Sequence, residues 1–134
     1  MRRSIFAVAL IAASVGLLSA APYSHKAAMA TFAKVLPKDA PRQFLSIPVD
    51  SKDRPSDDLL EFLRLGRGKT TYIGIVSPKL KYVENYVSGA LKLAKDEKFD
   101  GVTLLICTDK DGTERFTALL KDTGIKAICT TVGN

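Results

Sequence analysis

Segments typical of strands and segments typical of helices alternate along most of this chain. The ranges 43–49, 71–76, 102–107 and 125–132 are short and rich in β-branched and other apolar residues. The three stretches between them repeat apolar residues at helical spacing. Strands that are joined by single helices pair in parallel through right-handed crossovers. The sequence therefore predicts an α/β fold in βαβαβαβ order, with a mostly parallel sheet of about four strands.

Capping residues mark where the predicted helices begin and end. Ser56 is the predicted N-cap of the first helix and Gly66 its end, Ser77 opens the second helix, and a capping-box pattern that starts at Asp111 opens the third. The strand at 102–107 is apolar on both faces, so both faces of the sheet should be covered. We therefore expect a three-layer sandwich, Rossmann-like or flavodoxin-like in topology.

The first 30 residues have the order of an export signal. Two arginines precede an apolar block over 5–18, and small residues follow at 19–21. Cleavage is predicted after Ala20 or after Ala30. A retained membrane anchor is the alternative, because the apolar block approaches the ~17-residue lower limit of a membrane span. We expect a periplasmic or secreted protein that touches a membrane only through an uncleaved leader.

The chain without this leader suits a single domain. We divide it into a signal peptide and cleavage region at 1–30, a lead-in segment at 31–41 and an α/β domain at 42–134, and we expect the domain to fold without residues 1–30. The leader holds three of the 20 basic residues and none of the 14 acidic ones, so the net charge falls from +6 to +3 without it. This balance does not demand a polyanionic partner, and no nucleic-acid binding is expected.

Polar residues follow the carboxyl ends of three predicted strands. They are Asp50 after the first strand, Ser77 and Lys79 after the second, and Thr108 and Asp109 after the third. Parallel sheets bind ligands at this edge, so these are candidate binding residues for a protein partner or a small ligand. Each of them also fits a structural role in a turn or a cap, and both interpretations stay open here.

The run from Leu104 to Thr113 is an apolar strand followed by Asp109, Asp111 and Gly112. It resembles the first motif of haloacid-dehalogenase-type phosphatases. That resemblance implies a small Mg-dependent phosphatase-like hydrolase in which Asp109 is the nucleophile and Asp111 the acid/base, with Mg²⁺ held between them. The family's motif lies on an early strand of a longer domain, whereas only 21 residues follow Thr113. The alternative is that Asp111 caps a helix and Asp109 lies in a polar loop.

Scarce residue types exclude several kinds of site. The one histidine, His25, lies in or beside the leader, so a Ser-His or Cys-His catalytic pair is not expected, and two cysteines are too few for zinc. Cys107 and Cys129 are either two buried thiols or a disulfide. An oxidising compartment allows a disulfide, but the geometry of neighbouring parallel strands is unfavourable for one. No metal or cofactor is expected.

These observations favour an exported binding or interaction protein that is not an enzyme, with the hydrolase as the alternative. The basic residues between the predicted strands form either a cationic rim for an acidic ligand or an ordinary solvated surface. They are Arg64, Arg67, Lys69, Lys79 and Lys81.

Overall fold

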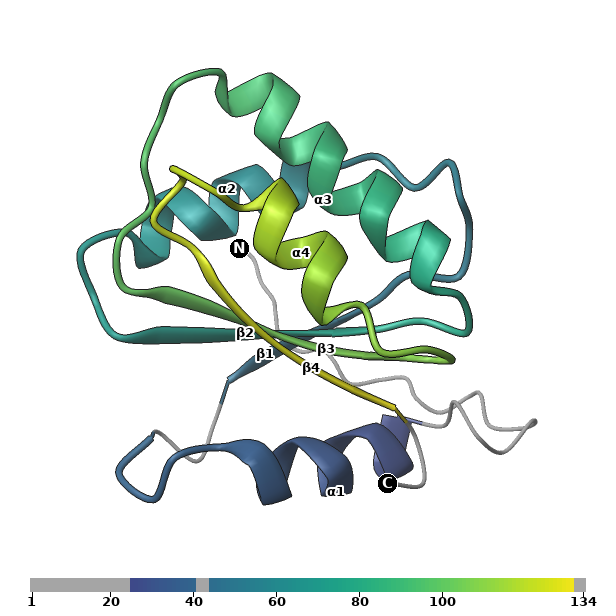
Figure 1. The fold of residues 1–134 in the computed structure, drawn as a ribbon. Coiled ribbons are helices and arrows are strands. Elements are labelled where there is room, and N and C mark those ends of the chain that lie inside the picture. Colours follow the sequence, from purple (N-terminus) through teal and green to yellow (C-terminus); the bar gives the residue numbers. More distant parts are fainter. Residues whose placement is uncertain (1–24, 41–43, 132–134) are drawn as a thin grey trace.

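The computed structural model describes residues 25–40 and 44–131. In chain order its elements are α1 (His25–Val35), β1 (Leu45–Pro48), α2 (Asp57–Gly66), β2 (Thr71–Val76), α3 (Leu80–Ala94), β3 (Val102–Thr108), α4 (Thr113–Leu119) and β4 (Lys126–Thr131). The four strands form one parallel sheet in the order β1-β2-β3-β4 (Figure 1). The predicted α/β class and four-stranded parallel sheet are confirmed.

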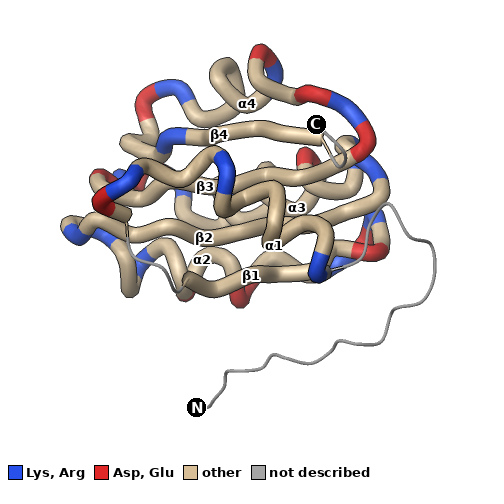
Figure 2. Tube along the Cα trace, turned by 90° about the horizontal axis from the view of Figure 1, so that it is seen from below, with Lys and Arg blue, Asp and Glu red and all other residues tan. Residues whose placement is uncertain are grey.

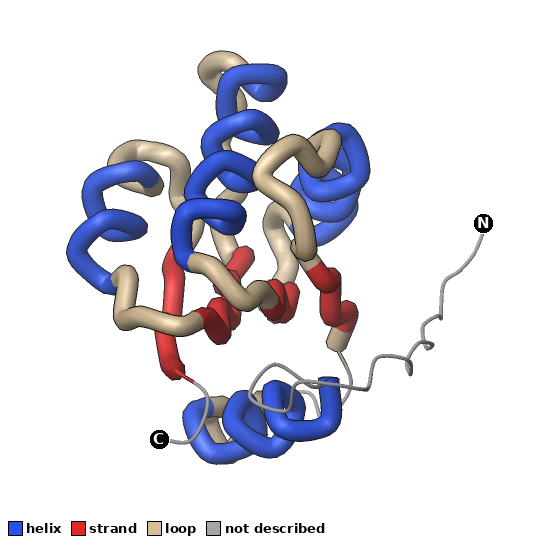
Figure 3. Tube along the Cα trace, turned by 90° about the vertical axis from the view of Figure 1, so that its right-hand side faces the viewer, coloured by secondary structure: helices blue, strands red, loops and turns tan. Residues whose placement is uncertain are grey.

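The order of the strands has no reversal. Rossmann-like and flavodoxin-like sheets reverse their strand order at a switch point, so this part of the prediction is wrong. Each crossover here moves one strand further in the same direction, and right-handed crossovers then place α2, α3 and α4 on one face (Figure 3). Periodicity in a sequence identifies strands and helices, but it does not tell in which direction a crossover steps across the sheet.

The opposite face of the sheet is covered by α1, which forms the third layer (Figure 3). Ala28 and Phe32 of α1 are fully buried and belong to a small core with Val76, Leu105 and Cys107. This helix is not predicted by the sequence analysis above, although Ala28 and Phe32 have the four-residue spacing of one helix face. α1 is what buries the second apolar face of β3.

The predicted boundary at residue 30 falls inside α1. The predicted signal peptide lies mostly outside the described residues, since the structure describes the chain only from residue 25. The division into leader, lead-in and domain therefore stays a prediction. Within the described ranges, no helix combines the length and the apolar character that crossing a membrane requires.

Gly74 of β2 lies against aromatic side chains on the face of the sheet that α1 covers. A Cβ atom at this position would lie 3.0 Å from ring carbons of both Phe32 and Phe44. These two rings meet edge to face, with centroids 5.9 Å apart. Glycine weakens a strand interior, so its presence in β2 is explained by the aromatic rings that occupy the space of a side chain.

The larger core lies between the sheet and α2, α3 and α4. Tyr86, Phe99 and Phe116 are its largest fully buried side chains. The predicted apolar stripe of the long helix is buried in α3, with Val83 and Val87 both at 0 % exposure. This core fixes the three crossover helices on the sheet and therefore also fixes the loops that connect them to the strands.

Candidate functional site

Three loops meet at the carboxyl edge of the sheet. The register pairs Pro48 with Val76 and Val76 with Cys107, so β1, β2 and β3 end level with one another. The candidate residues named from the sequence lie at or within three residues of these strand ends. Charged residues of both signs lie in the loops at both ends of the strands, this edge included, whereas the middle of the sheet carries few (Figure 2).

The loops after β2 and β3 are built alike. Ser77 directly follows β2 and Thr108 is the last residue of β3, and each is 1 % exposed. Ser77 Oγ accepts a hydrogen bond from the backbone N–H of Lys79 (3.2 Å) and donates one to the Lys79 carbonyl (3.1 Å). Thr108 Oγ1 makes the same two bonds with Lys110, at 3.3 and 2.8 Å. Each hydroxyl closes its own loop, and each loop leaves a lysine exposed at the turn.

Ser77 is therefore not the N-cap of the second predicted helix. α3 begins at Leu80, two residues later than Pro78, the expected first residue. Its first N–H is satisfied from another loop, because Leu80 N–H donates to Asp109 Oδ1 at 2.9 Å. Local sequence cannot reveal this bond, since it joins residues 29 positions apart. Asp109 thus ties the loop after β3 to the start of the helix that follows β2.

Asp111 stabilises the start of α4. Asp111 Oδ1 accepts hydrogen bonds from the backbone N–H of Thr113 (2.8 Å) and from its hydroxyl (2.5 Å). These two bonds hold the pKa of Asp111 below its usual range. The capping-box pattern predicts Asp111 as the N-cap of this helix. In the structure the N-cap is Gly112, so the helix begins one residue later than predicted and Asp111 precedes the N-cap.

The structure gives both carboxylates of the phosphatase-like motif a structural role. Asp109 accepts from Leu80 N–H, and Asp111 accepts from Thr113. Across residues 25–40 and 44–131, no three His, Cys, Asp or Glu side chains lie close enough together to hold a metal ion. We derive no catalytic step through this pair, and the hydrolase stays a prediction.

Cys107 and Cys129 are free thiols. The register pairs Cys129 with Ile106, the residue before Cys107, so the two side chains point to opposite faces of the sheet. Cys107 packs under α1, whereas Cys129 packs against the core beneath the crossover helices. Burial raises the pKa of each thiol to about 11. A disulfide between them would require one of the two strands to present its opposite face.

A polar cluster that the sequence analysis does not identify holds the loop after β1. Tyr86 is 1 % exposed, and its hydroxyl donates to Asp58 Oδ1 at 2.7 Å. Arg54 pairs with the other oxygen of Asp58 at 2.6 Å, and its guanidinium lies 5.2 Å from the centre of the Tyr86 ring. Burial, and then the charge of Asp58, raises the pKa of Tyr86. The four-residue spacing of Arg54 and Asp58 could have predicted their ion pair. It could not have predicted the contact with Tyr86, because that residue lies on α3.

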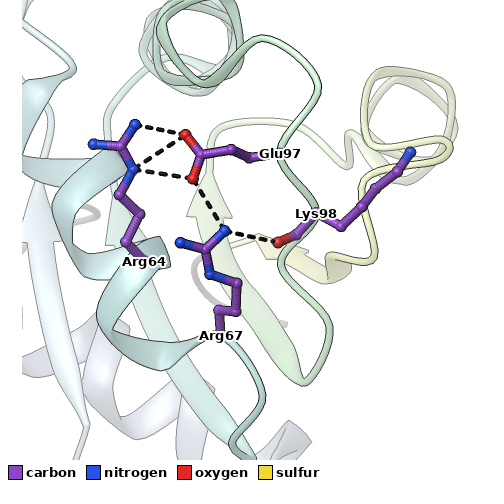
Figure 4. A network of polar contacts seen from close by, with 4 residues as sticks. All are labelled: Arg64, Arg67, Glu97 and Lys98. Atoms are coloured by element: carbon purple, nitrogen blue, oxygen red, sulfur yellow. Dashed lines mark hydrogen bonds and ion pairs between the residues drawn. The ribbon is translucent and has the colours of Figure 1, made fainter.

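The five basic residues do not gather into one cationic rim, which was one of the two interpretations left open by the sequence. Arg64 and Arg67 lie near the amino edge of the sheet and both pair with Glu97, at 2.5 and 3.0 Å (Figure 4). The hydrogen bonds from Arg64 lower the pKa of Glu97. Lys79 follows the carboxyl end of β2, so these basic residues are separated by the length of that strand. The sequence shows their charges but not the edge at which each residue lies.

Three surface hollows lie away from the carboxyl edge. One of about 310 Å³ is lined by Leu45 and Thr71, the first residues of β1 and β2. One of about 350 Å³ lies beside α4 and the first residue of β4, and one of about 360 Å³ lies between α1 and Phe44. The candidate residues are therefore on exposed loops and do not line any of these three hollows.

Comparisons of this chain with protein-family models, with curated proteins and with solved structures give no match. The functional conclusion rests on the residues and their geometry.

Proposed function

We propose that this chain is an exported α/β protein that binds a partner protein through the loops at the carboxyl edge of its sheet. One observation carries the proposal. The hydroxyls of Ser77 and Thr108 and the carboxylate of Asp109 are engaged in closing the loops, whereas Lys79 and Lys110 at the same turns are exposed. Groups that close a loop are not free for catalysis, but exposed charges on a fixed loop suit recognition.

Lys79 and Lys110 are held at the ends of two neighbouring strands. Their backbones are fixed by Ser77 and Thr108, and within the described ranges neither lysine forms an ion pair. A loop that is already ordered loses less conformational entropy when it binds. These two lysines are therefore the residues on which we expect partner recognition to depend most.

Acidic residues lie among these lysines. Asp50 is exposed after β1, and Asp111 is exposed before α4. A surface of mixed sign suits the polar rim of a protein interface better than it suits a polyanion, which would be repelled by the carboxylates. A protein partner is thus favoured over nucleic acid. Export is supported by the arginines, apolar block and small residues of the first 30 positions.

The proposal is tested by capture from the exported fraction of the source cells. The wild-type protein and a Lys79→Glu, Lys110→Glu double variant are immobilised, and bound proteins are identified by mass spectrometry. We expect a partner that the wild type captures and the double variant loses. Lys92→Glu is the matched control, because Lys92 is exposed in the last turn of α3, at the far end of that helix.

Equal capture by the double variant would contradict a role for this edge. Confinement of the full-length chain to the cytoplasm would contradict export. Stabilisation of the wild type by Mg²⁺ that disappears in Asp109→Asn and in Asp111→Asn would instead support the hydrolase.

A further inference from the structure

We infer that α1 belongs to the mature protein, so that the export leader is removed at the small residues 19–21 and not after Ala30. This inference rests on the proposed export and identifies its processing site. Both places carry the small residues that a signal peptidase accepts. They differ in what each cut leaves of the fold.

A cut after Ala30 divides α1. It removes six of the eleven residues of the helix, among them Ala28, which is fully buried. It also removes the carbonyl of Ala27, which accepts a hydrogen bond from the hydroxyl of Thr31 at 3.0 Å. The remainder, Thr31–Val35, is little more than one turn of about 3.6 residues, which is too short to stay helical. Phe32 would then no longer be held by a helix.

The same cut uncovers one face of the sheet. Leu105 and Cys107 are 0 % exposed and Val76 is 5 % exposed, and all three pack in the small core beneath α1. The other three described helices lie on the opposite face, so α1 is the only helix of the described part that covers these side chains (Figure 3). Parallel sheets have both faces buried, and an uncovered apolar face promotes aggregation. A mature protein that keeps this sheet therefore keeps α1.

The sequence of α1 differs from the apolar block that precedes it. Ala28 and Phe32 face the sheet, whereas Lys26, Ala30 and Lys34 are exposed. One apolar face and one polar face are typical of a helix on a globular domain. The block at 5–18 has no charged residue, as expected for a leader. The change from leader to domain therefore falls between this block and His25.

The first test determines the N-terminus of the exported protein. The full chain is expressed in a bacterium that secretes proteins, and the exported form is measured by intact-protein mass spectrometry. We expect it to begin between residues 20 and 22. Ala30→Arg, which changes an exposed position of α1, should be processed in the same way, whereas the double variant Ala20→Arg, Ala21→Arg should accumulate unprocessed.

An exported protein that begins at Thr31 would overturn the inference and leave export intact. A chain that is neither cleaved nor exported would overturn the export proposal and this inference with it. The two failures are distinguished by the cellular fraction that contains the protein.

The second test measures how far α1 shields the sheet from solvent, through the rate at which the Cys107 thiol is labelled. Chains that begin at Met1, Ala21 and Thr31 all carry Cys129→Ser, so that only Cys107 reacts with a thiol reagent. In the first two chains we expect labelling roughly 100-fold slower than in denaturant, because the thiol is buried. In the chain that begins at Thr31 we expect labelling at nearly the denatured rate. Slow labelling of Cys107 in that chain, with a cooperative unfolding transition, would show that residues 21–30 are dispensable and would overturn the inference.

Discussion

Replacing Gly74 with alanine tests the contact between α1 and the sheet. The added Cβ atom would lie 3.0 Å from the rings of Phe32 and Phe44, closer than ordinary van der Waals contact. Overpacking of this kind costs about 1–3 kcal/mol. Alanine is better than glycine in a strand interior by about 0.5–1 kcal/mol, which offsets part of that cost. We expect Gly74→Ala to lower the free energy of unfolding by about 1–2 kcal/mol.

The cause of this cost can be isolated in a second background. Phe32→Leu removes the ring from α1, and the Phe44 ring can then move away from the new methyl group. In that background we expect Gly74→Ala to be neutral or to stabilise by up to about 1 kcal/mol. The coupling between the two substitutions should therefore be about 2 kcal/mol, within the range found for residues in contact.

The assay is urea unfolding of the four proteins followed by far-ultraviolet circular dichroism, because the chain contains no tryptophan. The same loss in both backgrounds would refute the argument. Gly74 would then be required by the strand itself and not by the helix that packs on it.

Three further predictions follow from the core, the carboxyl edge and the thiols. Val87→Asp places an unpaired charge at a side chain of 0 % exposure, which should cost several kcal/mol and abolish the cooperative thermal transition; a wild-type melting temperature would contradict this. Asp109→Ala should lower the free energy of unfolding by about 1 kcal/mol because Leu80 N–H loses its acceptor, and Asp109→Asn should restore most of it. Burial raises the pKa of Cys107 and Cys129 from 9.0 to about 11, so the fold favours the neutral thiols. The contribution of the two thiols to stability is complete below about pH 9 and is lost as the pH rises toward 11. The measurement is urea unfolding of the wild type and of a Cys107→Ala, Cys129→Ala variant. We expect the difference between their free energies of unfolding to shrink over that pH range.

Local pattern was sufficient for most of the secondary structure. The strands at 71–76 and 102–107 coincide with β2 and β3 to within one residue, and the stripe through Val87 is buried in α3 as predicted. The strands are short apolar runs rich in β-branched residues and the helix repeats apolar residues about every 3.6 positions, and both patterns are visible in one stretch of chain. The same holds for the end of α2 at Gly66. The fold class and the order of the elements from β1 to β4 therefore followed from the sequence, whereas α1 did not.

Of the candidate site, the sequence could predict that the polar residues follow strand ends, but not their partners. Ser77 and Thr108 bond within their own loops, which is a local effect that turn chemistry allows. Asp109 accepts a hydrogen bond from Leu80, which belongs to another crossover, and Tyr86 of α3 donates one to Asp58 of α2. Those contacts exist only after the elements have packed.

The consecutive strand order and the role of α1 were decided by the tertiary structure. The sequence required cover on both faces of β3, since Leu104, Leu105 and Ile106 are apolar in succession. It did not determine whether a reversal of strand order or an additional helix would supply that cover. Here all three crossovers run in one direction, so their helices cover a single face and α1 must bury the other. The direction of a crossover depends on how packed layers fit together, and no single segment of the chain records it.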